Sequence, residues 1–220
     1  MYITPIVVGQ TSITSVMKFR PNIGSGFHQG VDFGWTPAHP DPEIRASAGG
    51  RVASSGAKDG WGFGTFIVIE HKVESGSEYT LYGHLASADV ADGKEIQAGD
   101  KIGVMGNTHD TRPPVPKHLH FEIITGAGTG PSGWLAAFSG DTTDRWQYRK
   151  NPIIEIDALG EGIRVNDYQG MTAKDQKERA FEDWVTGVMQ HSGLPRDSVL
   201  KKFRERGLAA PQWWNGAPEA

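Results

Sequence analysis

The sequence contains no cysteine. A disulfide framework is therefore excluded, and so is any zinc site built on thiolate ligands. This absence leaves the compartment open, because oxidising locations also contain cysteine-free proteins. An excess of positive charge is missing too, since 22 Lys and Arg residues stand against 26 Asp and Glu residues, for a net charge of −4. We therefore expect no broad nucleic-acid surface and no polybasic membrane anchor.

Long apolar runs are absent as well. No stretch approaches the roughly 20 apolar residues that a membrane-spanning helix needs. The first residues do not show the basic segment and long apolar run of a secretory signal peptide. We therefore expect no membrane insertion, and a substrate outside the cytoplasm would have to be reached by another route.

Glycine and β-forming residues dominate what is present. The 220 residues include 29 glycines, and 37% of the chain is hydrophobic while 22% is charged. This composition is typical of a globular, turn-rich β protein. The length is enough for one well-cored domain and a small appendage.

Closely spaced β-rich segments run from about residue 24 to residue 124, without a helical pattern between them. The predicted strands are 62–71 and 78–84, joined as a hairpin through Gly76, two short strands around the turn 98–100, and 118–124. This spacing predicts a mainly β fold with an antiparallel β-sheet or sandwich. Residues 1–20 are predicted to form an N-terminal arm or edge strand, and closing strands are expected up to about Ile156.

The pattern changes after about Asp157. Thr172 can cap a helix that Gly193 and Pro195 end. The apolar residues of this helix form one stripe, made of Phe181, Trp184, Val185, Val188 and Met189. A second short helix, 197–206, is predicted to bury Val199, Leu200 and Phe203. We therefore divide the chain into a β domain at 1–157 and a small C-terminal helical appendage at 158–220.

Two alternatives stay open for this appendage. Its apolar stripe is wide enough to need a partner surface, and Trp213 and Trp214 are costly to leave in water. Residues 158–220 could therefore dock to a virion assembly or a partner subunit. The same amphipathic pattern is expected if the helices only cap the β domain.

Two polar clusters carry the candidate chemistry. In the first, His28 precedes Asp32 by four residues, and in the second, His118 and His120 flank Leu119. Alternation along a strand places both of these histidines on one face, while Leu119 can enter the core. Two imidazoles and a carboxylate are a usual ligand set for catalytic zinc, which leaves a coordination position for water. Each cluster alone is modest evidence for a metal site.

Taken together, in their order and spacing, the motifs resemble peptidase family M23, the lysostaphin or LytM-like metallopeptidases. The motifs are His28-x-Gly30-x-Asp32, Ala46 to Val52, Gly60-Trp61-Gly62-Phe63-Gly64, Val68 to His71, Tyr82-Gly83-His84-Leu85, Gly99 to Gly103, Gly106-Asn107-Thr108 and His118-Leu119-His120-Phe121-Glu122. The resemblance covers about residues 24–122, and residues 1–157 would be the peptidase domain.

The resemblance implies roles for five residues. His28, Asp32 and His120 would bind one Zn²⁺ per chain, and the catalytic residues would be His84 and His118. His118 would face the metal-bound water, and His84 would lie opposite as a second general acid/base or an oxyanion stabiliser. The division of labour between these two histidines stays open.

The implied activity is that of a zinc metalloendopeptidase, which would hydrolyse peptide crosslinks of bacterial peptidoglycan through a metal-activated water. One alternative is a catalytically inactive LytM-like component that binds the wall or builds a phage particle. Another is a phosphocarrier or lipoyl-type carrier, although the sequence offers no convincing lysine for lipoylation. Since all five key positions are filled, we favour the enzyme.

The sequence departs from the family in two loops, and its other histidines have simpler interpretations. Residues 36–43 and 109–117 are longer than is usual and should border the cleft. His71 is interpreted as a packed or surface histidine, while His39 and His109 are expected at the surface. His191 lies at a helix end. Trp35, Trp61 and Trp134 could line a groove, but partial or full burial is the expectation for each.

The biological setting is inferred more indirectly. Without a signal peptide or an evident wall-binding repeat, the chain resembles a phage-borne lysin. It would act on the cell wall or in the periplasm, delivered by host lysis as an endolysin or carried as a virion component. The negative net charge favours the thin Gram-negative wall, and the bond that is cut is left open.

Overall fold

The computed structural model describes residues 2–21, 26–57, 61–110, 113–125, 128–138, 142–156, 164–206 and 208. Trp213 and Trp214, together with the domain boundary predicted at Asp157, lie outside these residues. Within the described part no helix is both long and apolar enough to cross a membrane.

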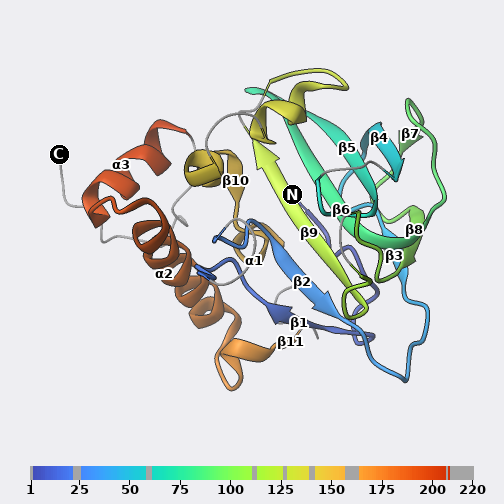
Figure 1. Cartoon of the computed structure of the whole chain (residues 1–220), viewed down its shortest axis with the longest axis horizontal. Helices are drawn as coiled ribbons and strands as arrows, with labels where there is room; N and C mark the ends of the chain where they lie inside the picture. Colours follow the sequence, from blue (N-terminus) through green and yellow to red (C-terminus); the bar gives the residue numbers. More distant parts are fainter. Residues whose placement is uncertain are drawn as a thin grey trace.

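One hydrogen-bonded sheet forms the centre of the fold (Figure 1). Its strands are β1 (Ser12–Ser15), β2 (Val31–Gly34), β3 (Glu43–Arg45), β4 (Gly50–Ala57), β5 (Thr65–Val73), β6 (Gly76–Ala88), β7 (Glu95–Ile96), β8 (Lys101–Met105), β9 (His118–Thr125), β10 (Arg149–Lys150) and β11 (Arg164–Val165). The main order is β11-β1-β2-β9-β6-β5-β4-β7, with β8 and β3 branching from β6 and β10 pairing with β9.

The mainly β prediction is confirmed, with one addition. The strand pairs are antiparallel except for β1 and β11, which run parallel through Ser12 and Arg164. The predicted hairpin is the longest feature of the sheet, and β5 and β6 meet at its turn through Val73 and Gly76. Gly76 has a φ of 130°, a conformation that L side chains rarely adopt, which explains why glycine stands at this turn.

Both faces of the central strands are buried, because the side chains of β5 alternate between two apolar clusters. Ile67 and Ile69 join the larger cluster, which also holds Leu119 and Phe121 of β9. Phe66 and Val68 join a second cluster on the opposite face, together with Trp134. Trp134 belongs to the 3-10 helix η1 (Gly133–Phe138), which covers this second face. The sheet is thus covered on both sides, and only one side also carries polar residues of β9.

The N-terminal arm is an integral part of the fold. β1 is hydrogen-bonded between β2 and β11, as expected for a strand near a sheet edge. Further upstream, Tyr2 is buried, forms a parallel bridge to Ile156, and donates its hydroxyl to Glu78 Oε2 at 2.6 Å. These contacts attach the start of the chain to β6 and to the segment that follows β10.

The expectation of closing strands up to about Ile156 is wrong except for the two-residue β10. Two 3-10 helices, η1 and η2 (Thr142–Tyr148), and the short helix α1 (Pro152–Glu155) occupy this segment. Local chemistry explains α1, since proline suits the first turn of a helix and the Asn151 side chain accepts a hydrogen bond from the Ile153 amide.

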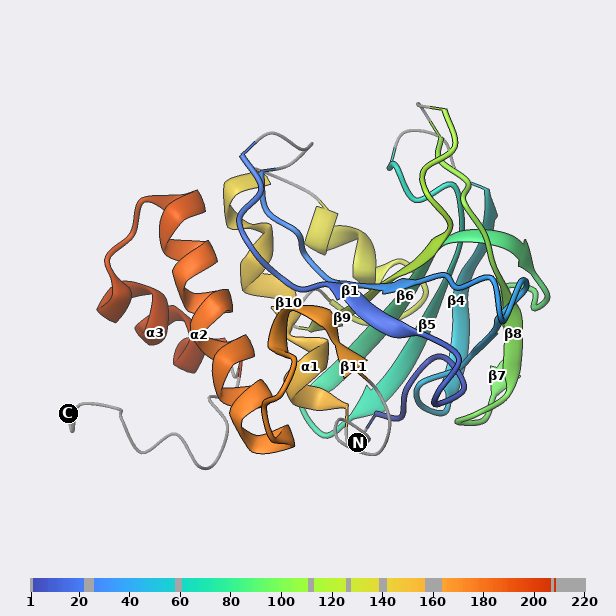
Figure 2. The same ribbon diagram turned by 90° about the horizontal axis from the view of Figure 1, so that it is seen from below.

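The two C-terminal helices follow the sequence prediction closely. They are α2 (Ala173–Ser192) and α3 (Arg196–Glu205). Thr172 caps α2 by accepting a hydrogen bond from the Asp175 amide at 3.2 Å, and Gly193 ends it in the left-handed conformation with a φ of 70°. Both helices lie at the end of the sheet next to β1, away from β7 and β8 (Figure 2).

The apolar stripe of α2 is buried inside the chain. Phe181, Trp184, Val185 and Val188 pack in one cluster with Phe203 of α3 and with Met17, Phe27 and Trp146 from the rest of the fold. Residues 158–220 also include β11 and the short 3-10 helix η3 (Asn166–Tyr168), so this part is not only helical. Docking of residues 158–220 to a partner stays a prediction, and it would have to use a surface other than this stripe.

Candidate metal centre

Strand pairing brings the two polar clusters together. β2 and β9 are antiparallel neighbours, and their register places Asp32 directly opposite His120. On the other side of β9, Gly83 of β6 is also opposite His120. Side chains alternate along β9 as predicted, so Leu119 and Phe121 are fully buried in the large cluster while His118 and His120 face the other side.

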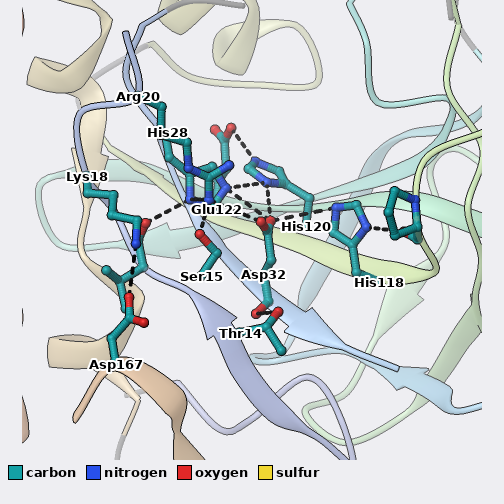
Figure 3. Close-up of polar contacts among 12 residues, drawn as sticks. Thr14, Ser15, Lys18, Arg20, His28, Asp32, His118, His120, Glu122 and Asp167 are labelled. Carbon is teal, nitrogen blue, oxygen red and sulfur yellow. Dashed lines mark hydrogen bonds and ion pairs between the residues drawn. The ribbon is translucent and has the colours of Figure 1, made fainter. Parts of the chain in front are cut away.

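Three side-chain atoms converge at the predicted metal site (Figure 3). His28 Nε2 lies 3.0 Å from Asp32 Oδ1 and 3.1 Å from His120 Nδ1, and the last two atoms are 3.0 Å apart. Ligands of a tetrahedral zinc ion, each about 2.0–2.2 Å from the metal, are separated by about 3.4 Å. The triad of His28, Asp32 and His120 thus has nearly the spacing of a zinc site.

Contacts on the far side of each imidazole bear on which ring nitrogen carries the proton. His28 Nδ1 lies 2.9 Å from the Val16 carbonyl oxygen, which can only accept a hydrogen bond, and 2.9 Å from Arg20 Nη2, which can only donate one. His120 Nε2 lies 2.9 Å from Glu122 Oε1, which accepts in the same way when ionised. With both rings neutral and their protons on His28 Nδ1 and His120 Nε2, the inner nitrogens carry lone pairs that point at each other and at the Asp32 carboxylate. Three acceptors this close repel one another, and a cation between them removes the repulsion. The residues present therefore fit a metal ion.

The electrostatics of the triad favour positive charge. Burial lowers the pKa of the His28 imidazole. Burial works to raise the pKa of Asp32, but the charges and hydrogen bonds of His28 and His120 outweigh it and hold this pKa well below its usual range. Burial also opposes the charged form of His120, yet hydrogen bonds to Asp32 and Glu122 raise its pKa to about 9. Surroundings that retain a proton in this way also suit a bound cation.

His84 and His118, the predicted catalytic pair, lie beside the triad. Their ring centroids are 4.6 Å apart, and His118 Nε2 lies 3.8 Å from Asp32 Oδ1. His84 Nδ1 donates to the Thr108 carbonyl at 2.7 Å, and His118 Nδ1 donates to the Pro116 carbonyl at 2.5 Å. Each neutral ring is left with a lone pair on Nε2, which is the state a general base requires.

His84 is held in an unusual backbone conformation. Its φ is 62°, and among the described residues it is the single non-glycine residue with a positive φ. Such strain persists where the surrounding structure imposes it and often marks a functional site. Burial first, and then the neighbouring His120 and His118, lower the pKa of His84 to about 3. The structure thus brings all five predicted site residues into one cluster.

The cluster is surrounded by further charged residues for which the sequence predicted no role. Arg20 Nη2 lies 3.3 Å from Asp32 Oδ2 and also contacts the Ser15 hydroxyl. Glu122 lies between His120 and Arg149. The spacing His118, His120, Glu122 places the glutamate on the same strand face and could have indicated it. Arg20 and Arg149 give no such signal, because neither belongs to a local motif.

The remaining histidines and tryptophans divide between core and surface. His71 is buried and bonds to the Gly49 carbonyl and the Thr80 hydroxyl, each at 2.8 Å, which confirms that it is a packed histidine. His109 is not simply a surface residue, since its ring stacks on that of His84 with centroids 6.0 Å apart. The reason is the path of the chain after β8, since the preceding residue, Thr108, accepts a hydrogen bond from His84 through its carbonyl oxygen. Trp134 is buried as expected, whereas Trp35 and Trp61 are exposed.

Comparisons with known proteins agree with the family resemblance seen in the sequence. Residues 26–130 match the model of peptidase family M23. The DD-carboxypeptidase/endopeptidase Mpg of Neisseria meningitidis is 32% identical over 131 residues, which are 59% of this chain and 28% of that protein. The murein hydrolase activator EnvC of Escherichia coli is 33% identical over 96 residues, which are 42% of this chain and 20% of that protein.

Among solved structures, the solution structure of lysostaphin matches with a TM-score of 0.51 and 20% identity, over 76% of this chain and 61% of that chain. This likeness shows the fold alone. The chain spans less than a third of the length of either curated relative. The matched segment contains all five residues of the cluster but neither Arg20 nor Arg149.

Proposed function

We propose that this chain, whose residues 26–130 match the model of peptidase family M23, is a zinc-dependent endopeptidase that hydrolyses peptide crosslinks of bacterial peptidoglycan. One observation carries the proposal above all others. Two imidazole nitrogens and a carboxylate oxygen converge within 3.1 Å, beside two further histidines whose Nε2 atoms are not used by the backbone. This arrangement combines a metal site with acid/base groups.

The triad would hold the metal through His28 Nε2, Asp32 Oδ1 and His120 Nδ1. When bound, zinc supplies Lewis acidity, which polarises a carbonyl group and makes water a nucleophile near neutral pH. With three protein ligands, a bound zinc ion would keep a coordination position for water, as catalytic sites require. The backbone and carboxylate contacts of the two histidines keep these rings in place for that role.

His84 and His118 would move the proton. In peptide hydrolysis a C–O bond forms, the C–N bond breaks, and the proton of the attacking water must reach the leaving amine. A neutral imidazole within reach can accept this proton at Nε2 and then donate it to the amine. The second imidazole can stabilise the negative charge that develops on the carbonyl oxygen. Either histidine can take either role, because both point the same ring nitrogen away from the backbone.

Peptidoglycan is proposed as the substrate from the relatives. Mpg is named a DD-carboxypeptidase/endopeptidase, a name that fits peptide stems of the wall. The two loops that depart from the family, 36–43 and 109–117, would set which peptide bond is preferred. Delivery of the enzyme by a phage stays a prediction from the sequence.

A second candidate function follows from one relative. EnvC is named a murein hydrolase activator, so likeness to the family also fits a protein that binds and regulates without cutting. Against this candidate, the chain fills all three metal positions and both acid/base positions with residues that the fold brings together. We therefore rank the enzyme first.

The test uses the purified full chain. Its zinc content is measured after dialysis, and peptidoglycan digested by it is analysed by mass spectrometry for newly cut peptide stems. We expect one zinc per chain and cleavage of peptide bonds with intact glycan strands. Zinc binding without cleavage of peptidoglycan from any source would favour the activator. Absence of bound zinc after loading would overturn the proposal.

A further inference from the structure

Arg149 is among the most deeply buried charged residues of the described chain, and it lies next to the triad's supporting glutamate. Its guanidinium is fully buried, and its Nε lies 2.6 Å from Glu122 Oε2. The other oxygen of the same carboxylate lies 2.9 Å from His120 Nε2. The side chains therefore form a continuous buried chain of contacts from Arg149 through Glu122 to His120 Nε2, on the far side of the ring from the triad.

The strand register explains how a residue 29 positions away reaches the site. β10 pairs with β9 so that Arg149 is directly opposite Ile124. Opposite residues of an antiparallel pair share a face, and so do His120, Glu122 and Ile124 along β9. The guanidinium consequently lies beside Glu122 on the face that holds the metal triad.

Fold stability alone does not account for this arrangement. Moving two ions out of water costs free energy that a single contact rarely returns, so a buried ion pair is weak evidence for stabilisation. Arg149 also gains little elsewhere, because Nη1 and Nη2 have no hydrogen-bond partner among the described residues. Besides Glu122, the guanidinium has a favourable cation–π contact with the Phe138 ring, whose centroid lies 4.7 Å from the guanidinium carbon.

A function for the pair follows from the needs of His120. Its Nδ1 can bind a metal when the ring proton is on Nε2, and an ionised carboxylate at Nε2 favours that arrangement. Glu122 is buried, and the Arg149 Nε contact at 2.6 Å holds its Oε2 while Oε1 meets His120 Nε2. Without the Arg149 contact, the carboxylate could turn Oε1 away from His120.

We propose that Arg149 is a positioning residue for the metal centre, which holds the Glu122 carboxylate through its Nε contact so that Oε1 meets His120 Nε2 and His120 turns Nδ1 toward the zinc. The inference rests on the proposed zinc function. It assigns a role to a residue outside the segment that matches the peptidase family. The role is indirect, since Arg149 touches neither the metal ligands nor the acid/base histidines.

The test measures zinc dissociation constants of the full chain by competition with a chelator. Arg149→Met and Glu122→Gln should each weaken zinc binding by about 10- to 100-fold, the usual range for outer contacts of metal ligands. If Arg149 acts through Glu122, the two losses should not add. The double variant should then bind zinc no more weakly than the single variant with the lower zinc affinity. Arg149→Lys keeps a charged donor that can still bond to the Glu122 carboxylate, and it should lose less than Arg149→Met.

Two controls separate positioning from general damage. Arg145→Met removes a neighbouring arginine that donates to the Phe138 carbonyl and does not contact Glu122. Val68→Ala opens a cavity in the apolar cluster of the same face and should lower the melting temperature. Both should keep the zinc affinity of the unaltered chain.

The possible outcomes are distinct. Zinc affinity of Arg149→Met within twofold of the unaltered chain would overturn the inference. Losses that multiply in the double variant would do the same, because the two residues would then act independently. If Arg149→Met does not fold, the zinc affinity of Arg149→Lys is compared with that of Glu122→Gln. Weaker zinc binding by both variants would support the inference, and an affinity of Arg149→Lys within twofold of the unaltered chain would overturn it. Failure of the unaltered chain to bind zinc would overturn the proposed function, and this inference with it.

Discussion

His84 and His118 face each other across 4.6 Å between ring centroids, and each is fixed by a hydrogen bond from its Nδ1 to a backbone carbonyl. The carbonyls belong to Thr108 and Pro116, which flank the loop before β9. One loop thus orients both imidazoles, although 33 residues separate the two histidines in the sequence. A shared support of this kind holds the two imidazoles in a fixed position relative to each other.

Removal of either imidazole should slow the reaction without removing the metal. We expect His84→Ala and His118→Ala to keep zinc and to lose about 10²–10⁴-fold in rate, the usual contribution of a general acid or base. His84→Asn is the matched variant at the strained position, because asparagine tolerates a positive φ better than alanine. A metal-free His84 or His118 variant would make that histidine a ligand instead.

Loss of a ligand should have a different signature. We expect His120→Ala to lose both zinc and activity, because two remaining donors hold the ion too weakly. The control is His71→Gln, which alters a buried histidine of the same sheet that bonds to Gly49 and Thr80. The control should lose stability and keep zinc. Stoichiometric zinc in dialysed His120→Ala would contradict the ligand assignment.

The close approach of β9 to the start of β2 depends on Gly30. A Cβ atom at this position would lie 2.3 Å from the Phe121 carbonyl oxygen and 2.9 Å from Glu122 Cγ. Gly30→Ala should therefore force the strands apart, weaken zinc binding and destabilise the fold by about 1–3 kcal/mol. Gly49→Ala is the matched control, since its Cβ would meet nothing closer than 3.4 Å. Equal melting temperatures for the two variants would refute the steric argument.

A buried carboxylate should make stability depend on pH. Glu78 accepts hydrogen bonds from Tyr2 and Lys150, both at 2.6 Å; burial works to raise its pKa, but these two contacts outweigh it and lower the pKa. A lowered pKa gives stability that is present above the unfolded pKa of about 4.3 and is lost as pH falls through the folded pKa. Glu78→Gln should thus destabilise the chain at pH 7 more than at pH 3. Urea unfolding at several pH values measures the difference in unfolding free energy between the unaltered chain and Glu78→Gln. A difference that grows toward low pH would contradict this prediction.

Truncation after Asp157 tests whether residues 158–220 are separable. The cut removes β11 and uncovers Met17, Phe27 and Trp146, which pack against α2 and α3. Because Phe27 directly precedes the proposed ligand His28, we expect earlier melting, aggregation and weaker zinc binding. A soluble truncated chain that binds zinc and cuts peptidoglycan at an unchanged rate would support the docking alternative instead.

The sequence by itself determined the elements whose signals are local. Alternation along 118–124 placed two histidines opposite two core residues, Gly76 marked the hairpin, and Thr172 and Gly193 marked the ends of a helix. The five residues of the cluster could be predicted because each lies in a motif of only a few consecutive residues. Each of these features depends on backbone geometry within one strand, turn or helix.

Only the tertiary structure decided the contacts that surround those motifs. Arg20 reaches Asp32, and Arg149 reaches Glu122, through strand pairings that no local pattern specifies. The apolar stripe of α2 likewise packs against other residues of the same chain. Its amphipathic pattern alone is the same for an internal and an external contact surface. The physical reason is shared: side chains far apart in sequence meet through the register and packing of whole elements, and many distant interactions fix these together.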